Sequence, residues 1–554
     1  MVGGAWPYIH GIPHIGNLIG SELSADIYAR YLRVRGEDVV FVSGSDEHGT
    51  PIEVEAAKQG VEPKTLTDKF HAKVVEIFKN FGLSFDNYTR THNPIHISFC
   101  QNFFKRIYEN GYIIDREMDQ LYCDNCRRFL PDRFVHGTCP YCGYSYARGD
   151  QCEACGRVLD PLELVNPICA ICGSTPIIRS TRHWFLDLPQ LSQKLKEWLV
   201  SNPSLSERVK AFSLSWIEEG LRPRAVTRDN KWGIPAPFPG AEEKTIYVWF
   251  EAVLGYISAT VELGISRGEP SLWEKYWLDK QTRTVYFIGK DNIPFHTIIL
   301  PALLLAHGEG YVLPWNVSAT EYLTFEGQKF SKSKKIGVWL DEALAILPSD
   351  YWRYYLAKNR PETSDTNFRW QDFVSTVNSD LNDDIGNYIH RVLTFIHQNF
   401  EGKVPEHHAL DADDERILMR IREIKHRIDE LMDEVRERQS LIEVLNLVKE
   451  ANSYLNLKEP WKLLKTDPKR AATTLFVASQ IVAALTVFLE IFTPDTAAAL
   501  REMIGLGYDK NGSWGRLEDT ILQPNTKITK PKPLFRKVSE QEIMQRRERV
   551  STMT

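Results

Sequence analysis

Four Cys-x-x-Cys pairs restrict the possible folds of this chain more than any other feature. They use eight of the nine cysteines and are Cys123/Cys126, Cys139/Cys142, Cys152/Cys155 and Cys169/Cys172. One such pair can supply half of a tetrahedral metal site, and a second pair completes it. No secretory signal is visible, so metal binding is expected rather than disulfides. We therefore predict two structural Zn²⁺ ions in a small insertion with little apolar core of its own. The spacing alone does not decide which pairs share an ion.

The length and charge of the chain set further limits. A chain of 554 residues is too long for one core, so we expect three or more domains. Its 67 basic and 73 acidic residues give a net charge of -6, so any RNA contact must use local basic surface. The longest apolar run, 471–489, contains threonine, serine and glutamine and predicts a buried bundle helix rather than a membrane span. We expect a cytoplasmic protein without membrane contact.

Strand-like and helix-like segments alternate in two parts of the chain, which predicts a doubly wound parallel sheet of Rossmann type. We assign residues 1–114 and 245–320 to this catalytic domain. The cysteine-rich insertion covers 115–244, and a linker domain covers 321–372. Residues 373–522 contain only helical patterns and predict an all-α bundle, followed by a tail at 523–554.

Particular segments support this division. Apolar residues at helical spacing from Leu23 to Val34, with Gly36 after them, predict a helix and its end. The runs 38–42 and 284–288 predict buried strands. Farther on, we expect helices over 410–431, 440–457 and 470–490.

Two short motifs carry the nucleotide chemistry. His14-Ile15-Gly16-Asn17 follows a strand-like start and opens a helix, and Lys329-Phe330-Ser331-Lys332-Ser333 lies in a polar loop. No P-loop or Gly-x-Gly-x-x-Gly turn is present. In this order the two motifs resemble the two signature sequences of class I aminoacyl-tRNA synthetases, although Asn17 replaces a histidine and Phe330 replaces a methionine.

The resemblance implies an adenylation site. A helix N-terminus binds anions, and the enzyme needs only to position ATP·Mg²⁺ and stabilise developing charge. His14 and Asn17 would donate to phosphate oxygens, Gly16 would leave room for the adenine-ribose, and Lys329 and Lys332 would supply positive charge. Without the second motif, His14 would be interpreted as a capping or core histidine.

Four further segments resemble the methionyl-tRNA synthetases of archaeal type: residues 5–8, 44–50, 247–252 and 289–296. All lie at or beyond the ends of predicted strands, where open α/β sheets bind ligands. The resemblance implies that Asp46 binds the methionine ammonium group and that the thioether is enclosed by Ala5, Tyr8, Trp249, Ala252, Tyr256, Phe295 and His296. Sulfur–aromatic contacts suit this ligand, although core packing is the alternative for each aromatic residue.

The same resemblance implies the metal and anticodon residues. One zinc ion would take Cys139, Cys142, Cys152 and Cys155, and the other Cys123, Cys126, Cys169 and Cys172. Asn387, Arg391 and Trp461 would bind the CAU anticodon, the tryptophan by stacking on a base. From the residues alone, core packing of Trp461 and a plain surface position of Arg391 are favoured.

The resemblance thus implies a methionine–tRNA ligase that joins L-methionine to initiator and elongator methionine tRNA at the expense of ATP. We expect it to act as a monomer. The rival hypotheses are another class I aminoacyl-tRNA synthetase and a non-catalytic zinc-ribbon RNA-binding protein. In the basic tail, residues 531–535 could pack back onto the protein. The remainder fits a solvated polar tail and an RNA-contacting one equally well.

Overall fold

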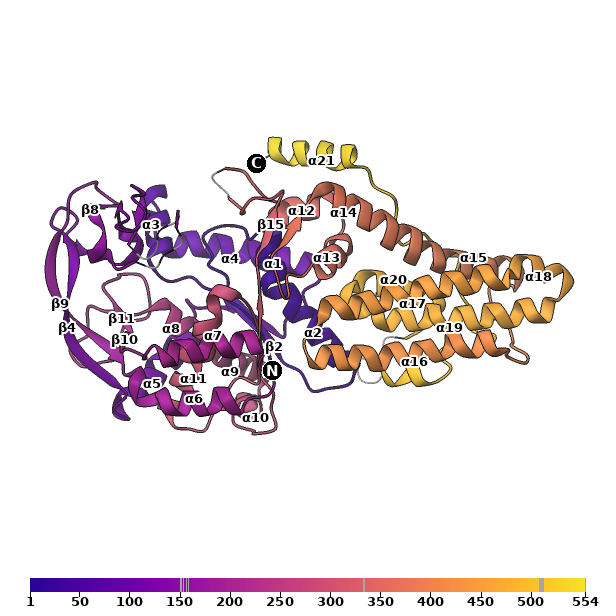
Figure 1. The fold of residues 1–554 in the computed structure, drawn as a ribbon, viewed down its shortest axis with the longest axis horizontal. Coiled ribbons are helices and arrows are strands. Elements are labelled where there is room, and N and C mark those ends of the chain that lie inside the picture. Colours follow the sequence, from indigo (N-terminus) through magenta and orange to yellow (C-terminus); the bar gives the residue numbers. More distant parts are fainter. Residues whose placement is uncertain are drawn as a thin grey trace.

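The computed structural model describes residues 1–149, 152, 154–155, 157, 159–331, 334–507 and 513–553. The molecule is elongated, with an α/β half that contains the N-terminus and a helical half beyond it (Figure 1). Lys332 and Ser333, which belong to the second predicted nucleotide motif, lie outside the described residues.

Five parallel strands form the central sheet, in the order β14-β13-β1-β2-β3. Their bounds are β1 Val2–Gly4, β2 Phe41–Ser45, β3 Asn87–Arg90, β13 Val285–Gly289 and β14 Asn316–Thr320. The strand order reverses between β1 and β13, and such a switch point is where doubly wound sheets bind ligands. The predicted parallel fold is confirmed.

Helices cover both faces of this sheet. They are α1 Ile15–Gly20, α2 Glu22–Val34, α3 Thr50–Gln59, α4 Pro63–Asn80, α5 Pro94–Glu109, α8 Val248–Ala252, α9 Gly255–Arg267, α10 Leu272–Trp277 and α11 Leu300–His307. Helix α2 ends before Gly36, whose φ of 85° suits a glycine, as the sequence predicted. The strand expected at 38–42 instead begins at Phe41, because Asp38 bonds Tyr276 at the sheet border.

The cysteine-rich insertion is built on a long antiparallel ribbon of β4 Ile113–Cys123 and β9 Ile177–Leu186. The short strands beside it are β5 Arg128–Phe129, β6 Val135–Thr138, β7 Ala147–Arg148 and β8 Val165–Cys169, and β10 Arg224–Ala225, β11 Thr227–Arg228 and β12 Thr245–Ile246 follow. A small separate core contains four of the cysteines and a few apolar residues such as Phe134. Helices α6 Ser192–Ser201 and α7 Glu207–Glu218 instead share the core of the α/β half.

A linker and a helical bundle complete the chain, and no strand follows residue 368 in its described part. The linker contains β15 Leu323–Phe325, α12 Leu340–Ile346, α13 Ser349–Lys358 and β16 Thr366–Phe368. The bundle contains α14 Trp370–Thr376, α15 Asn387–Asn399, α16 Ala412–Asp433, α17 Glu437–Lys458, α18 Pro460–Thr466, α19 Pro468–Phe492 and α20 Pro494–Ile504. The helices expected from 410 onward are thus present, with ends that differ by a few residues.

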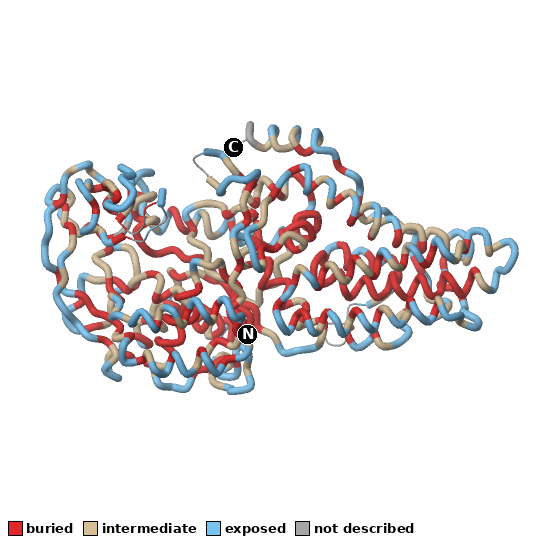
Figure 2. The backbone as a smooth tube through the Cα atoms, viewed as in Figure 1, coloured by how far each residue is buried: buried red, intermediate tan, exposed pale blue. Residues whose placement is uncertain are grey.

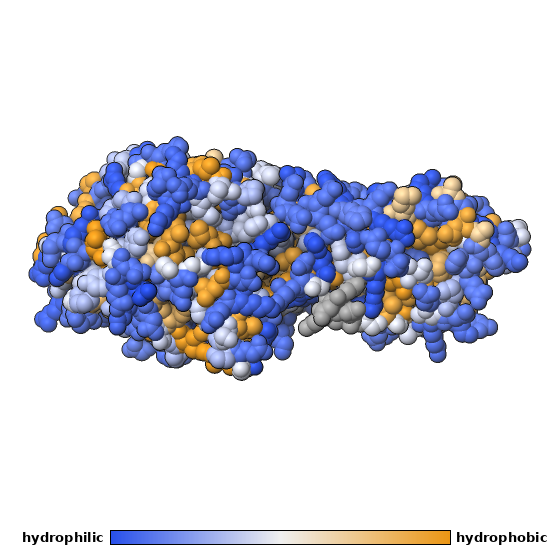
Figure 3. Space-filling view, turned by 90° about the horizontal axis from the view of Figure 1, so that it is seen from below, coloured by the Kyte–Doolittle hydropathy of each residue, from blue (hydrophilic) through white to orange (hydrophobic). Residues whose placement is uncertain are grey.

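Helix α19 accounts for the longest apolar run. It is the one helix among the described residues that is long and apolar enough to cross a membrane, and its most apolar stretch is 100% buried. Figure 2 shows the buried backbone in the middle of the bundle, with exposed residues on the outer helices. In Figure 3, hydrophobic side chains form patches on both halves between larger hydrophilic areas. The prediction of a buried bundle helix is confirmed.

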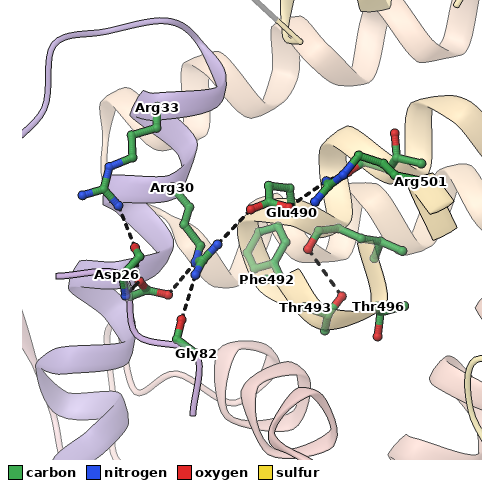
Figure 4. Close-up of polar contacts among 12 residues, drawn as sticks. Asp26, Arg30, Arg33, Gly82, Glu490, Phe492, Thr493, Thr496 and Arg501 are labelled. Atoms are coloured by element: carbon green, nitrogen blue, oxygen red, sulfur yellow. Dashed lines mark hydrogen bonds and ion pairs between the residues drawn. The ribbon is translucent and has the colours of Figure 1, made fainter. Parts of the chain in front are cut away.

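Buried ion pairs join the two halves (Figure 4). Arg30 of α2 donates to Asp26 at 2.9 Å and to Glu490 of α19 at 2.8 Å, and the fully buried Arg353 donates to Asp26 at 2.6 Å. Burial opposes ionisation of Asp26, but the two guanidinium groups outweigh it and hold the pKa of that carboxyl below its ordinary value. Helix α2, which follows α1, is therefore fixed to the bundle by ion pairs as well as by packing against α19.

The tail does not extend freely into solvent. Phe535 is buried and packs edge-on against Tyr351, with ring centroids 5.5 Å apart. The return of residues 531–535 to the protein is therefore confirmed. Helix α21 Glu540–Met553 follows and lies beside α12 and α14.

Candidate active site and metal centres

The carboxyl ends of the sheet strands bring the predicted segments together. The chain beyond β1 runs alongside the end of β2, where Tyr8 pairs with Asp46 in a short parallel bridge. Ala5 continues the pairing with β13, donating its N–H to Phe287 O at 3.0 Å. The site is therefore formed at the switch point by backbone from both halves of the doubly wound sheet.

His14 caps helix α1 through its own side chain. Its Nδ1 accepts the Asn17 N–H at 3.2 Å, and the Asn17 side-chain oxygen accepts the His14 N–H at 3.1 Å. Burial lowers the pKa of His14 to about 4, so the ring is neutral at pH 7. With Nδ1 used as an acceptor, the ring proton is on Nε2, which remains a hydrogen-bond donor. The capping role and the donor role are thus compatible.

The second motif meets the first through Phe330. The rings of His14 and Phe330 stack with centroids 4.0 Å apart and planes at 7°. A Cβ atom at Gly16 would lie 3.0 Å from His14 Nδ1 and 3.1 Å from Phe330 Cε2, so Gly16 makes room for this stack. Lys329 is exposed beside Tyr322, with its Nζ 6.0 Å from the ring centroid.

Three predicted aromatic residues form one wall. Trp249 of α8 stacks on Phe295 at 4.5 Å between centroids and meets Tyr8 edge-on at 5.7 Å. Phe295 begins a π-helical turn, Phe295–Ile299, a conformation common at functional sites. All three rings are partly exposed, and Ala252 lies at the end of α8, also partly exposed. These rings can therefore contact a ligand as well as one another.

Tyr256 and His296 form a buried polar pair beside that wall. The Tyr256 hydroxyl lies 2.9 Å from His296 Nε2, while His296 Nδ1 lies 3.0 Å from Asn292 O. A carbonyl oxygen only accepts, so Nδ1 carries the proton and Nε2 accepts the tyrosine hydroxyl. Burial lowers the pKa of His296 to about 4 and raises that of Tyr256 well above its ordinary value, so both groups are neutral.

The carboxyl group of Asp46 is buried at the same edge of the sheet. It is 3% exposed, and its Oδ1 accepts no hydrogen bond from the described residues. Burial, followed by the nearby Glu251, raises the pKa of Asp46 well above its ordinary value. An incoming ammonium group would supply the missing partner.

Glu251 and His48 lie in the predicted segments 247–252 and 44–50, but neither was predicted to be a site residue. Glu251 is fully buried and bonds His48 Nδ1 at 2.8 Å, and His48 Nε2 lies 3.1 Å from His92 Nδ1. The only available signal was the carboxylate within the aromatic segment 247–252, and its partners come from distant parts of the chain.

The eight paired cysteines form two groups of four, and in each group all Sγ atoms lie within 4.8 Å of one another. The groups are Cys123, Cys126, Cys169 and Cys172, and Cys139, Cys142, Cys152 and Cys155, the same two sets that the resemblance implied. Cross-pair Sγ–Sγ distances are 3.5 and 3.9 Å in the first group and 4.0 and 3.6 Å in the second. Tetrahedral Zn–S bonds of about 2.3 Å place sulfurs about 3.8 Å apart, so both donor sets fit the ion.

The remaining cysteine, Cys100, is fully buried. Its Sγ lies 3.5 Å from His96 Nε2, outside both groups.

Two of the predicted anticodon residues meet in the bundle. The Arg391 guanidinium of α15 lies 5.3 Å from the ring centroid of Trp461 at the start of α18, and it donates to Asn456 at 3.1 Å. Trp461 remains 38% exposed, so it is not a core residue. Asn387 is exposed one helical turn before Arg391 on α15.

Comparisons with known proteins agree with this architecture. Residues 1–393 match the family model "tRNA synthetases class I (M)", and residues 404–554 match "Anticodon binding domain of methionyl tRNA ligase". The chain is 53% identical over 546 residues to the methionine–tRNA ligase of Thermofilum pendens, covering 97% of this chain and 95% of that protein. It is 55% identical to that of Ignicoccus hospitalis, with the same coverage.

A solved structure supports the fold alone. The methionyl-tRNA synthetase of Mycobacterium tuberculosis bound by methionyl-adenylate has a TM-score of 0.80 at 23% identity, covering 97% of this chain and 99% of that one. The doubly wound sheet, the His14 turn and the helical bundle define a class I aminoacyl-tRNA synthetase. Within that class, the chain belongs to the methionyl-tRNA synthetase family.

Proposed function

We propose that this protein is a methionine–tRNA ligase, which activates L-methionine with ATP and transfers it to the 3′-terminal adenosine of methionine tRNA. Near full-length identity above 50% to curated methionine–tRNA ligases supports the activity. The arrangement of the residues at the carboxyl ends of the sheet strands supports the roles assigned to them individually.

In the first step, the methionine carboxylate attacks the α-phosphate of ATP and pyrophosphate leaves. Asp46 would pair with the substrate ammonium group, and the Tyr8, Trp249 and Phe295 rings would enclose the thioether. The Nε2–H of His14 would donate to phosphate oxygens, together with Asn17 Nδ2. Lys329 and Lys332 would supply positive charge, and Mg²⁺ would accompany ATP. The protein thus contributes position and charge rather than covalent chemistry.

Tyr256 and His296 would set the selectivity of the side-chain pocket. Because the Tyr256 hydroxyl donates to His296 and both groups are neutral, neither presents a charge to the substrate side chain. A neutral, polarizable thioether is tolerated beside such a pair, whereas a charged side chain would lose its hydration without compensation.

We assign one Zn²⁺ ion to each cysteine group. The thiolate donors, their tetrahedral spacing and the small core around them support structural ions that stabilise the insertion. Neither group lies among the adenylation residues, so no catalytic step is assigned to these ions.

In the bundle, Trp461 would stack on an anticodon base, and Asn387 and Arg391 would bind base edges or phosphate. The cation–π contact orients the tryptophan while leaving part of its ring exposed. We further propose that the protein works as a cytoplasmic monomer on both initiator and elongator methionine tRNA.

The aromatic wall of Tyr8, Trp249 and Phe295, joined to the buried Asp46 by the bridge between Tyr8 and Asp46, is the observation that carries the amino-acid assignment. The test is ATP–pyrophosphate exchange by the purified protein with each of the twenty amino acids. Methionine should give by far the highest kcat/KM. A higher kcat/KM for another amino acid would indicate a different class I ligase. RNA binding without exchange would indicate a non-catalytic zinc-ribbon protein.

A further inference from the structure

Helix α21 is attached to the protein by specific contacts. Ile543 is 1% exposed within the same core as α12 and α14. Arg546 donates to Ile346 O, at the end of α12, at 2.8 Å. Glu542 pairs with Arg536 at 2.6 Å and with Arg546 at 2.9 Å, which ties the first turn of α21 to the chain before it. The helix therefore has a defined position and orientation.

Arg547 extends from this helix to the linker domain. Its Nε donates to Glu342 Oε1 and a terminal nitrogen donates to Gly337 O, both at 2.7 Å. The guanidinium also lies 5.6 Å from the ring centroids of Phe325 and Trp370. An arginine can make these contacts at once because its planar group has several fixed donors and stacks on aromatic faces.

Gly337 closes the loop that carries the second nucleotide motif. Backbone hydrogen bonds of 2.9 Å in both directions join Ser331 to Ile336. Gly337 has a φ of 142°, and a Cβ there would lie 2.6 Å from Phe330 Cδ1. Only glycine suits this position. Residues 338–340 then pair with residues 13–15, through Ile15 N to Val338 O at 3.1 Å and Leu340 N to Pro13 O at 3.0 Å.

These contacts form one continuous path from Arg547 through Gly337 and Phe330 to His14. The described parts of the loop, 329–331 and 334–337, are held on one side by the first motif and on the other by the C-terminal helix. We propose that Arg547 is a positioning residue for adenylation: it fixes the base of this loop, and α21 is the element that holds Arg547 in place. This inference rests on the proposed function.

The alternative is that the C-terminal tail serves only to bind tRNA. Adenylation, which is measured without tRNA, distinguishes this alternative from a positioning role of Arg547. The experiment measures methionine-dependent ATP–pyrophosphate exchange for the full-length wild type, Arg547→Ala and Arg547→Lys. Arg547→Ala should lower kcat by ~10- to 100-fold, the loss that a misplacement of about 1 Å can cause, with the KM for methionine within about twofold of wild type. Arg547→Lys should be intermediate, because lysine keeps the charge near Glu342 but lacks the planar fork.

Lys537→Ala is the matched control. This tail lysine pairs at 2.9 Å with Asp383 of the bundle, its side chain is 64% exposed, and it has no ion pair with the described residues of the loop. It should exchange at the wild-type rate. Thermal melting of each variant shows whether a lower kcat comes from a misplaced loop or from loss of the fold. If Arg547→Ala does not fold, the kcat of Arg547→Lys alone tests the inference. A folded Arg547→Ala protein with the wild-type kcat would overturn the inference, whether or not its tRNA charging is impaired. If Arg547→Ala does not fold, a wild-type kcat in Arg547→Lys would overturn it. Absence of exchange in the wild type would instead overturn the proposed function.

Discussion

The imidazole of His14 lies flat against the phenyl ring of Phe330, with centroids 4.0 Å apart and planes at 7°. Residues from the catalytic domain and from the linker domain thus form one surface. His14 is neutral, and its Nδ1 accepts the Asn17 N–H, so Nε2–H is the one donor left on the ring. The stack on Phe330 therefore fixes the direction of this donor. The stack therefore links the position of the loop to the orientation of a phosphate-binding group.

Removal of the ring at Phe330 should therefore slow adenylation. An aromatic pair contributes about 0.5–1.5 kcal/mol beyond burial, so Phe330→Ala should lower the kcat of ATP–pyrophosphate exchange roughly 3- to 10-fold. Phe330→Tyr, which keeps the ring, is the control and should retain most of the activity. Exchange kinetics at saturating ATP and methionine provide the measurement. An unchanged kcat in the alanine variant would show that the stack has no catalytic role.

Asp46 should affect methionine binding much more than ATP binding. Asp46→Asn keeps the shape of the side chain but removes the charge, and truncating a buried charge pair costs about 2 kcal/mol or more. The KM for methionine should rise at least ~30-fold, while the KM for ATP changes little. The exposed Asp124, which pairs with Arg179 in the insertion, provides the control variant Asp124→Asn. Equal effects of the two substitutions would contradict an ammonium-binding role.

The cysteine groups should bind metal independently of each other. Cys139→Ser and Cys123→Ser should each lower the zinc content from about two ions per chain to about one and reduce the melting temperature. Cys100→Ser should retain both ions, because Cys100 lies outside both groups. Elemental analysis of purified protein measures the content. Wild-type protein that contains no zinc and does not change its melting temperature with a chelator would refute the assignment.

Trp461 should act on tRNA and not on adenylation. Base stacking on an aromatic side chain contributes ~1–3 kcal/mol, so Trp461→Ala should reduce the kcat/KM of tRNA charging roughly 5- to 100-fold. ATP–pyrophosphate exchange should stay at the wild-type level. Leu457→Ala, at a position near the end of α17 that is 63% exposed, is the control. Parallel loss of charging and exchange in Trp461→Ala would indicate a structural role.

Local patterns were sufficient to predict much of the fold. Regular apolar spacing and Gly36 located helix α2, and the long bundle helices α16, α17 and α19 were each anticipated with small errors at their ends. Strand ends were less accurate: β2 is shifted toward Ser45, because hydrogen bonds at Asp38 and pairing with β3 decide its limits. Such limits depend on neighbouring strands, which local spacing does not describe.

Contacts between distant segments could not be predicted. The spacing of the cysteines could not assign pairs to ions, since the first and last pairs lie together only after the ribbon of β4 and β9 forms. In the tail, Arg546 and Arg547 fitted both a solvated and an RNA-contacting segment, yet both bind carbonyl groups of the linker domain. Glu251 was missed for the same reason, because His48 is its partner only in the folded protein.

We propose that His14, beside the loop of Phe330, forms an ATP-dependent adenylation site. Its most direct test is methionine-dependent ATP–pyrophosphate exchange by the wild type, His14→Ala and His14→Ser. Serine can still cap helix α1, so it separates loss of the cap from loss of the Nε2 donor. We expect clear exchange in the wild type and a loss of at least ~100-fold in both variants. Exchange at the wild-type rate in either folded variant would contradict this proposal.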